Sequence, residues 1–239
     1  PASWYLANDT QFYLLAPLVI LPLWRKKKLG LALTGILGLV SVIIPGIIKA
    51  NKNLPAVFTY SLDMKSYMED IYYKPWTRFG TYIVGIVLGY LLHSNSKNPT
   101  LFSNLPNRVV RLGWLTSTFV AVGIMFGGVY YSDPDNEDAI YNSLHSAVYC
   151  ALHRVIWSIC TAWVIFACAT GNGGLLDTIL SHKIFVPLAR LTFGIYFSSC
   201  QVQMVYHYKQ PHPFYYSKYN TIFLFFGHMG MCILASYVL

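Results

Sequence analysis

The stretch LGLALTGILGLVSVIIPGII, residues 29–48, contains no charged residue. As an α-helix rising 1.5 Å per residue, it would cover about 30 Å, the thickness of the hydrocarbon core of a bilayer. The rest of the 239-residue chain has a similar character, since 55% of its residues are hydrophobic and only 11% are charged. Soluble domains carry about 25% charged residues. The sequence therefore predicts an all-α, polytopic transmembrane helix bundle.

Six further stretches are long and apolar enough to cross the bilayer. The seven predicted spans are 4–24, 29–48, 76–92, 112–131, 147–169, 184–206 and 220–239. The long connection 49–75 mixes acidic and aromatic residues, which favours a helix lying on the membrane surface. We expect residues 1–239 to form a single membrane domain.

The densest basic cluster, residues 25–28, predicts the orientation, because such clusters stay in the cytoplasm. Alternation of the spans then places the amino terminus outside and the carboxyl terminus in the cytoplasm. The acidic loop 133–138 falls outside under this topology. The formal net charge of +8 comes from basic residues in short segments between apolar runs, so no nucleic-acid partner is expected.

Two arginines, Arg154 and Arg190, lie inside apolar spans, where insertion of an arginine costs roughly 2.5–3.5 kcal/mol. Such residues predict a polar cavity within the membrane. Asp9 and Arg78 lie near the outer ends of their spans, close to the level of Arg154. An ion pair between Asp9 and an arginine could lock helix packing or form part of a substrate-facing site. Arg190 could extend its side chain to the cytoplasmic interface or bind an anionic group.

Other side chains give weaker signals. His153 and His228 could act as acid–base groups or could be hydrogen-bonded packing residues. His207 and His212 have no cysteine or carboxylate nearby, so we expect no metal site, and no motif indicates a bound cofactor. The pairs Gly85…Gly89 and Gly123…Gly127 allow close approach of helix backbones.

Several stretches together resemble the acyltransferase-3 superfamily, in particular its animal branch, called "nose resistant to fluoxetine". They are WYLANDTQFYLLAPL (4–18), YYKPWTRFGTYIVGIVLGYLL (72–92) and HRVIWSICTAWVIFACATGNGGLLDTILSHKIFVPLARLTFGIYF (153–197). The resemblance implies that the chain is the carboxyl-terminal part of a larger membrane domain. It also implies further helices before these residues, with a catalytic histidine in the first of them. No catalytic base can therefore be assigned within this sequence. The residues that correspond to cavity positions are Asp9, Arg78, Arg154 and Arg190.

The resemblance implies a membrane O-acyltransferase that moves an acyl group from a cytoplasmic donor, with acyl-CoA as the candidate, to a hydroxyl acceptor. Arg190 and Lys183 would lie near the donor phosphates, and the acceptor would bind near Asp9, Arg78 and Arg154. The alternative is a carrier of lipids or hydrophobic small molecules without covalent chemistry. A seven-helix receptor is disfavoured, because no Asp-Arg-Tyr follows the third span and no Asn-Pro-x-x-Tyr lies in the seventh. Either retained function needs membrane lipids as partners and fits the plasma membrane or the endoplasmic reticulum.

Overall fold

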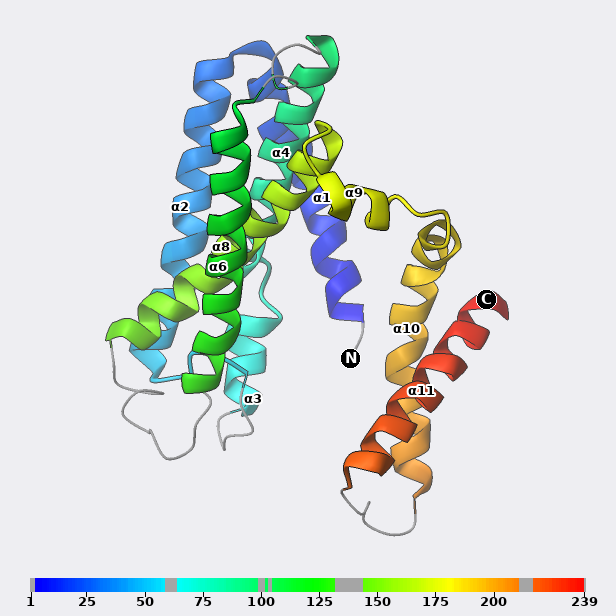
Figure 1. Ribbon diagram of the computed structural model, residues 1–239. Coiled ribbons are helices and arrows are strands. Elements are labelled where there is room, and N and C mark those ends of the chain that lie inside the picture. The colour runs from blue at the N-terminus through cyan, green and yellow to red at the C-terminus, as the bar shows by residue number, and fades with distance from the viewer. Residues whose placement is uncertain are drawn as a thin grey trace. The chain divides into compact units, whose positions relative to one another are not determined.

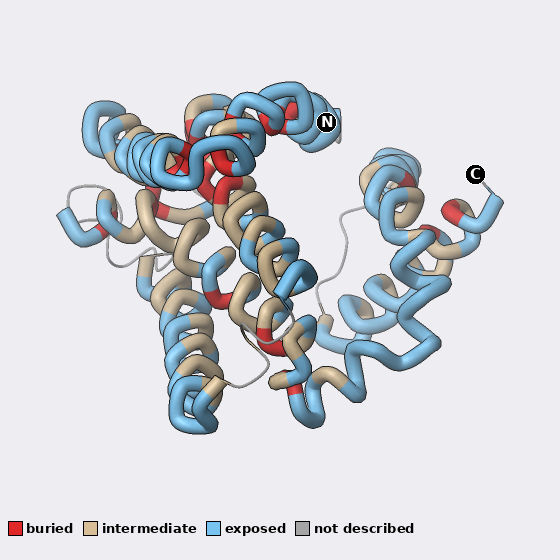
Figure 2. Tube along the Cα trace, turned by 90° about the horizontal axis from the view of Figure 1, so that it is seen from above, coloured by how far each residue is buried: buried red, intermediate tan, exposed pale blue. Residues whose placement is uncertain are grey.

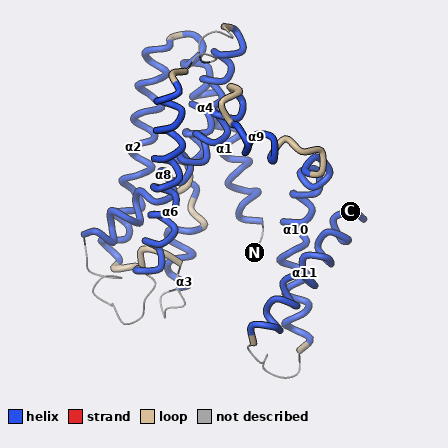
Figure 3. The backbone as a smooth tube through the Cα atoms, in the orientation of Figure 1, coloured by secondary structure: helices blue, strands red, loops and turns tan. Residues whose placement is uncertain are grey.

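The computed structural model describes residues 3–58, 64–98, 102, 105–131, 144–210 and 217–238. Within these ranges the regular structure is helical, with no strand, as Figure 3 shows. The chain divides into two compact units. The first comprises Tyr5–Gly174, and the second comprises Leu175–Leu239 with residues 1–4. The all-helical prediction is confirmed for the described residues.

Five long helices build the first unit (Figure 1): α1 Ser3–Arg25, α2 Lys27–Lys52, α4 Phe79–Lys97, α6 Asn107–Tyr130 and α8 Leu144–Ala169. Three short elements lie between α2 and α4: α3 Met64–Tyr67, the π-helical η1 Met68–Tyr72 and the 3₁₀-helical η2 Pro75–Thr77. The second unit contains α9 Gly174–Leu180, α10 Phe185–Lys209 and α11 Lys218–Val238. Helices α10 and α11 pack against each other.

Each of the seven predicted spans overlaps a long helix in the described part of the chain, with ends that shift by a few residues. Five of these helices are long and apolar enough to cross a membrane: α1, α2, α6, α8 and α11. Their outward surfaces are apolar as well. Phe119, Met125 and Phe126 on α6 are each at least 66% exposed. Figure 2 shows that most of each helix surface is exposed, with buried positions where helices face one another. Apolar faces of this extent suit contact with lipid.

Helix α8 organises the first unit, because it packs against α2, α4 and α6. A polar contact joins α2 to the start of α4. The Ser41 hydroxyl donates to the Trp76 carbonyl at 3.1 Å and accepts from the Gly80 N–H at 2.6 Å. This contact satisfies a backbone donor in the first turn of α4 that has no partner within the helix.

The connection between α2 and α4 folds back onto the end of the bundle. Helix α2 ends at Lys52. Asn53, the next residue, has a φ of 47°, the left-handed conformation that asparagine tolerates at a helix end. Tyr67 and Ile71 are then buried in a cluster with Cys150 of α8. The connection therefore contains helical turns, as predicted, but one face of them packs on the protein. Lys49, near the end of α2, is only 1% exposed.

The close approach that the glycine pairs allow is not used at three of the four residues. A Cβ added at Gly85, Gly89 or Gly123 would meet no atom within 4 Å. The close approach in α4 is at Gly80 instead, where a Cβ would lie 2.9 Å from Cγ2 of Val155 and 3.0 Å from Oγ of Ser41. The spacing of small residues showed that packing was sterically allowed but not which glycine faces a neighbour.

We predict that Gly80→Val destabilises the bundle by about 1–3 kcal/mol, because the added carbons force α4 away from α8 and from Ser41. Thermal unfolding of the full-length protein in detergent micelles measures the effect. Gly123→Ala is the matched control and should change the midpoint little, since its Cβ enters open space. Equal midpoints for Gly80→Val and wild type would contradict this packing.

Candidate functional site

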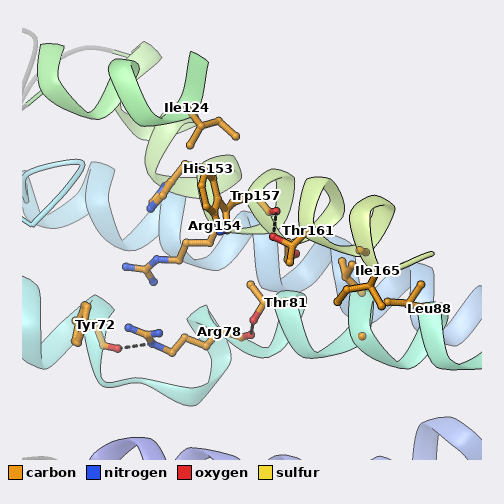
Figure 4. A pocket seen from close by; sticks show the side chains of 14 residues that line it. Tyr72, Arg78, Thr81, Leu88, Ile124, His153, Arg154, Trp157, Thr161 and Ile165 are labelled. Carbon is orange, nitrogen blue, oxygen red and sulfur yellow. Dashed lines mark hydrogen bonds between the residues drawn. The ribbon is translucent and has the colours of Figure 1, made fainter. Parts of the chain in front are cut away.

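A cavity of about 640 Å³ lies in the first unit, between α4 and α8. Figure 4 shows Arg78 and Arg154 at one end of it and Leu88 and Ile165 at the other. Arg154 and Ile165 are eleven positions apart on α8, which corresponds to about 16 Å along the helix axis. The cavity is therefore elongated, with a cationic end and an apolar end.

Arg78 is held just before α4 begins. Its Nε donates to the Tyr72 carbonyl at 2.8 Å, and its guanidinium carbon lies 4.4 Å from the centroid of the Tyr72 ring. The turn that places it is fixed by Thr77, whose buried hydroxyl donates to the Ile71 carbonyl at 2.6 Å. Pro75 starts this turn, since its fixed φ suits the first residue of a helix.

Arg154 enters the cavity from α8, opposite Arg78. Its Nη2 donates to the hydroxyl of Tyr67 at 3.0 Å, whereas its Nη1 is buried and makes no hydrogen bond. Tyr67 is 2% exposed. Burial raises the pKa of Tyr67, and the charges of Arg154 and Arg78 oppose that rise. The raised pKa keeps the hydroxyl neutral at physiological pH, so Tyr67 offers Arg154 an acceptor but no compensating charge.

Among the residues that the structure describes, no aspartate or glutamate lines this cavity. Among the described residues the structure has one ion pair, Lys52–Asp70 at 2.7 Å, and neither residue lines the cavity. Arg154 thus places a guanidinium in this mostly apolar space, and its buried Nη1 makes no hydrogen bond. Buried cations are normally paired, so this arrangement is suited to an anionic ligand.

His153 also lines the cavity, next to Arg154 on α8. Its Nδ1 lies 2.8 Å from the Tyr149 carbonyl, and its ring stacks on the Tyr149 ring with 5.1 Å between centroids. Because a carbonyl can only accept, the proton of this hydrogen bond is on Nδ1. The remaining nitrogen, Nε2, is the one left for a ligand.

The structure brings together two of the four predicted site residues, Arg78 and Arg154. Asp9 is exposed on α1 and pairs with neither arginine, so the predicted Asp9–arginine pair is wrong. Its neighbour Asn8 is the buried residue, and its side-chain amide donates to the Tyr73 carbonyl at 3.0 Å. One step along a helix turns the side chain by about 100°, so counting depth along the span could not distinguish the two.

Arg190 lies on α10 in the second unit and is exposed. It makes no hydrogen bond or ion pair with the residues that the structure describes. Both of its predicted roles, extension to the interface and binding of an anion, stay predictions.

Sequence reasoning missed Tyr67, which accepts the hydrogen bond of Arg154. The signal for it was weak. Tyr67 and Ile71 are four positions apart, the spacing of residues on one helical face, but the connection is too short and irregular for this pattern to stand out.

Fold and cavity together define an all-helical membrane protein with a cationic site at one end of an apolar pocket. The chain belongs to the acyltransferase-3 family, whose model, described as an acyltransferase domain, matches residues 1–239. It is 34% identical over 227 residues to Nose resistant to fluoxetine protein 6 of Caenorhabditis elegans, covering 91% of this chain and 27% of that protein. It is 23% identical over 223 residues to Regulator of hypoxia-inducible factor 1 of Caenorhabditis elegans, covering 85% of this chain and 41% of that protein.

The chain thus spans less than half the length of these two curated relatives. No solved structure matches it. The resemblance to the family is confirmed.

We predict that Tyr67→Phe lowers stability by about 1–3 kcal/mol, because the partly buried guanidinium of Arg154 loses its acceptor. The measurement is thermal unfolding of the full-length protein in micelles. Tyr82→Phe is the control, since the Tyr82 hydroxyl makes no hydrogen bond with the described residues. In an Arg154→Met background the Tyr67→Phe change should cost less. An equal cost in both backgrounds would show that the two groups do not interact.

Proposed function

We propose that this chain contributes the acceptor site of a membrane O-acyltransferase, which moves an acyl group from a cytoplasmic donor to a hydroxyl acceptor. The observation that carries the proposal is the buried Nη1 of Arg154, which makes no hydrogen bond, in a cavity of a chain from this family. The acceptor occupies that cavity. The donor, for which acyl-CoA is the candidate, meets Arg190 and Lys183, both of which are exposed. Asp9 is no longer part of the proposed site, because its carboxylate is exposed outside the cavity.

In this reaction the acceptor oxygen bonds to the acyl carbonyl carbon, the carbon–sulfur bond of the thioester breaks, and the thiol leaves with a proton. Negative charge develops on the carbonyl oxygen as the new bond forms. Preorganised donors stabilise such a charge most effectively in a site with little water. The buried Nη1 of Arg154, which has no partner, is a donor of this kind. We assign no residue of this chain as the catalytic base.

The distribution of charge in the first unit supports the proposed orientation. The end of the bundle formed by the α1–α2 turn, the end of α4 and the start of α6 carries seven basic residues, Arg25, Lys26, Lys27, Lys28, Lys97, Arg108 and Arg111. No acidic residue lies among them, whereas Glu69 and Asp70 lie in the connection beyond the other end of α2. We therefore place the basic end in the cytoplasm, which puts the arginine pair toward the outer side. The plasma membrane and the endoplasmic reticulum both fit this placement.

The second candidate function is a carrier of lipids or hydrophobic small molecules. It is favoured by the lining of the cavity beyond the arginines, where Val84, Leu88, Ala162 and Ile165 suit an apolar ligand. A carrier would hold the same ligand in the same cavity without breaking a covalent bond. Formation of an acylated product from acyl-CoA by the full-length protein separates the two functions.

We predict that Arg190→Ala weakens donor binding by about tenfold or more, equivalent to about 1.4 kcal/mol, because a phosphate loses its guanidinium partner. Arg154→Ala should leave donor binding unchanged and abolish acyl transfer. A non-hydrolysable acyl-CoA analogue, titrated against the full-length protein in micelles, measures donor affinity. The control is Arg108→Ala, an exposed arginine of α6. Equal donor affinity in wild type and Arg190→Ala would count against this assignment.

A further inference from the structure

The end of the first unit that carries the α1–α2 turn is strongly cationic. The last turn of α4 lies at the same end (Figure 1). The turn lies within residues 10–62 and α4 within residues 71–132, and neither stretch of sequence contains an aspartate or a glutamate. These stretches therefore supply no carboxylate to the exposed basic residues at this end, which are Arg25, Lys26, Lys27, Lys28 and Lys97.

A pocket of about 310 Å³ lies between α1 and α4, next to this cationic end. Trp24 of α1 lines it together with Tyr90 and His93 of α4. Arg25 follows Trp24 in the chain, and Lys97 lies one helical turn after His93, on the same face of α4. Basic side chains thus border an aromatic pocket. None of its lining residues lines the cavity between α4 and α8.

Gly89 of α4 helps to keep this pocket open. It lines the pocket, and a Cβ added to it would meet no atom within 4 Å. Helix packing therefore does not require a glycine here, although glycine inside a helix is unfavourable compared with alanine. A larger side chain at this position would take up space in the pocket, so the glycine leaves room for a ligand.

The change from apolar to basic residues places the pocket at the membrane surface. Trp24, the last residue of α1 before the basic turn, is 69% exposed, and tryptophan is typical of the headgroup level. The orientation of the chain in the membrane accounts for basic residues at one end, but it does not account for an open pocket beside them.

The volume of the pocket favours a membrane lipid over a water-soluble ligand. About 310 Å³ is at the lower end of the range for sites that enclose a drug-sized molecule. The pocket can therefore enclose only part of a larger ligand. The rest of a lipid stays in the bilayer, where its chains lie in an apolar environment, whereas a soluble ligand would gain little from so small a contact.

We infer that this pocket binds an anionic phospholipid. Its headgroup contacts Arg25 and Lys97, and the first carbons of one chain pass Gly89 between Trp24 and Tyr90. Each basic residue near a membrane surface favours anionic lipids by about fivefold. A zwitterionic headgroup carries its own cation and gains little from this attraction. Binding here does not depend on acyl transfer, because no residue of this pocket belongs to the proposed acceptor or donor site.

Trp24 reports on the pocket directly. The full-length protein is reconstituted into phosphatidylcholine vesicles that contain increasing fractions of brominated phosphatidylserine or of brominated phosphatidylcholine with the same chains. Bromine atoms on a lipid chain quench indole fluorescence on close contact. The difference between wild type and Trp24→Phe gives the part of the quenching that comes from this pocket.

We expect the Trp24 component to show a preference of about tenfold or more for the anionic lipid. Arg25→Gln and Lys97→Gln should each reduce this preference about fivefold, because one charge is lost at the border of the pocket. Arg108→Gln is the matched control. It removes an exposed charge of α6 that does not border the pocket, and it should change the preference little.

Gly89→Leu tests the pocket itself, since it fills space and leaves every charge in place. It should weaken binding of the anionic lipid, whereas Gly123→Leu, whose side chain also enters open space, should match wild type. The surface-charge variants decide the matter if Gly89→Leu does not fold.

Equal quenching of the Trp24 component by the two brominated lipids would overturn the inference. So would an equal loss of preference in Arg25→Gln, Lys97→Gln and Arg108→Gln, because the attraction would then come from the general charge of this end. Unchanged binding in a folded Gly89→Leu variant would also overturn it, since the pocket would then take up no part of the lipid.

Discussion

The central constraint on this structure is that the guanidinium of Arg154 is held in a mostly apolar cavity, where it donates to a neutral tyrosine hydroxyl. Arg78 and Arg154 line one cavity, and the other titratable residues in the described part of its lining are a histidine and a tyrosine. The protein compensates with neutral acceptors, the Tyr72 carbonyl for Arg78 and the Tyr67 hydroxyl for Arg154. Neutral acceptors satisfy hydrogen bonds but leave the charges in place. The hydrogen bond to the neutral Tyr67 hydroxyl therefore leaves the positive charge of Arg154 in the site.

That arrangement depends on the connection between α2 and α4. It supplies both acceptors, and it is fixed to the bundle by burial of Ile71 against Cys150 and by the hydrogen bond from Thr77 to the Ile71 carbonyl. The close approach at Gly80 then sets the distance between α4 and α8, the two helices that form the cavity walls. Packing at the end of the bundle therefore also sets the geometry of the site.

Much of the fold could be predicted from the sequence, because the length and apolarity of a membrane helix are local properties. The run 29–48 needs no information about its neighbours to be read as a span, and it lies within α2. The direction in which a side chain faces is not a local property, because it depends on which neighbour each helix meets. Asn8 rather than Asp9 turns inward, and Gly80 rather than Gly85 meets another helix.

The candidate site shows the same division. The cost of a guanidinium in hydrocarbon is a property of the residue, so Arg154 stood out in the sequence alone, and depth along the span placed Arg78 near it. Tyr67 reaches Arg154 only because the chain folds back after α2. Asn53, the left-handed residue where this fold-back starts, lies in no distinctive sequence pattern. Lys49 was predicted to lie outside the membrane spans, but it is buried where the connection folds back onto the end of the bundle. Charged residues in apolar spans can thus indicate a candidate site before the groups that hold them are known. The groups that position these charged residues can be identified only from a structure that places the irregular segments of the chain.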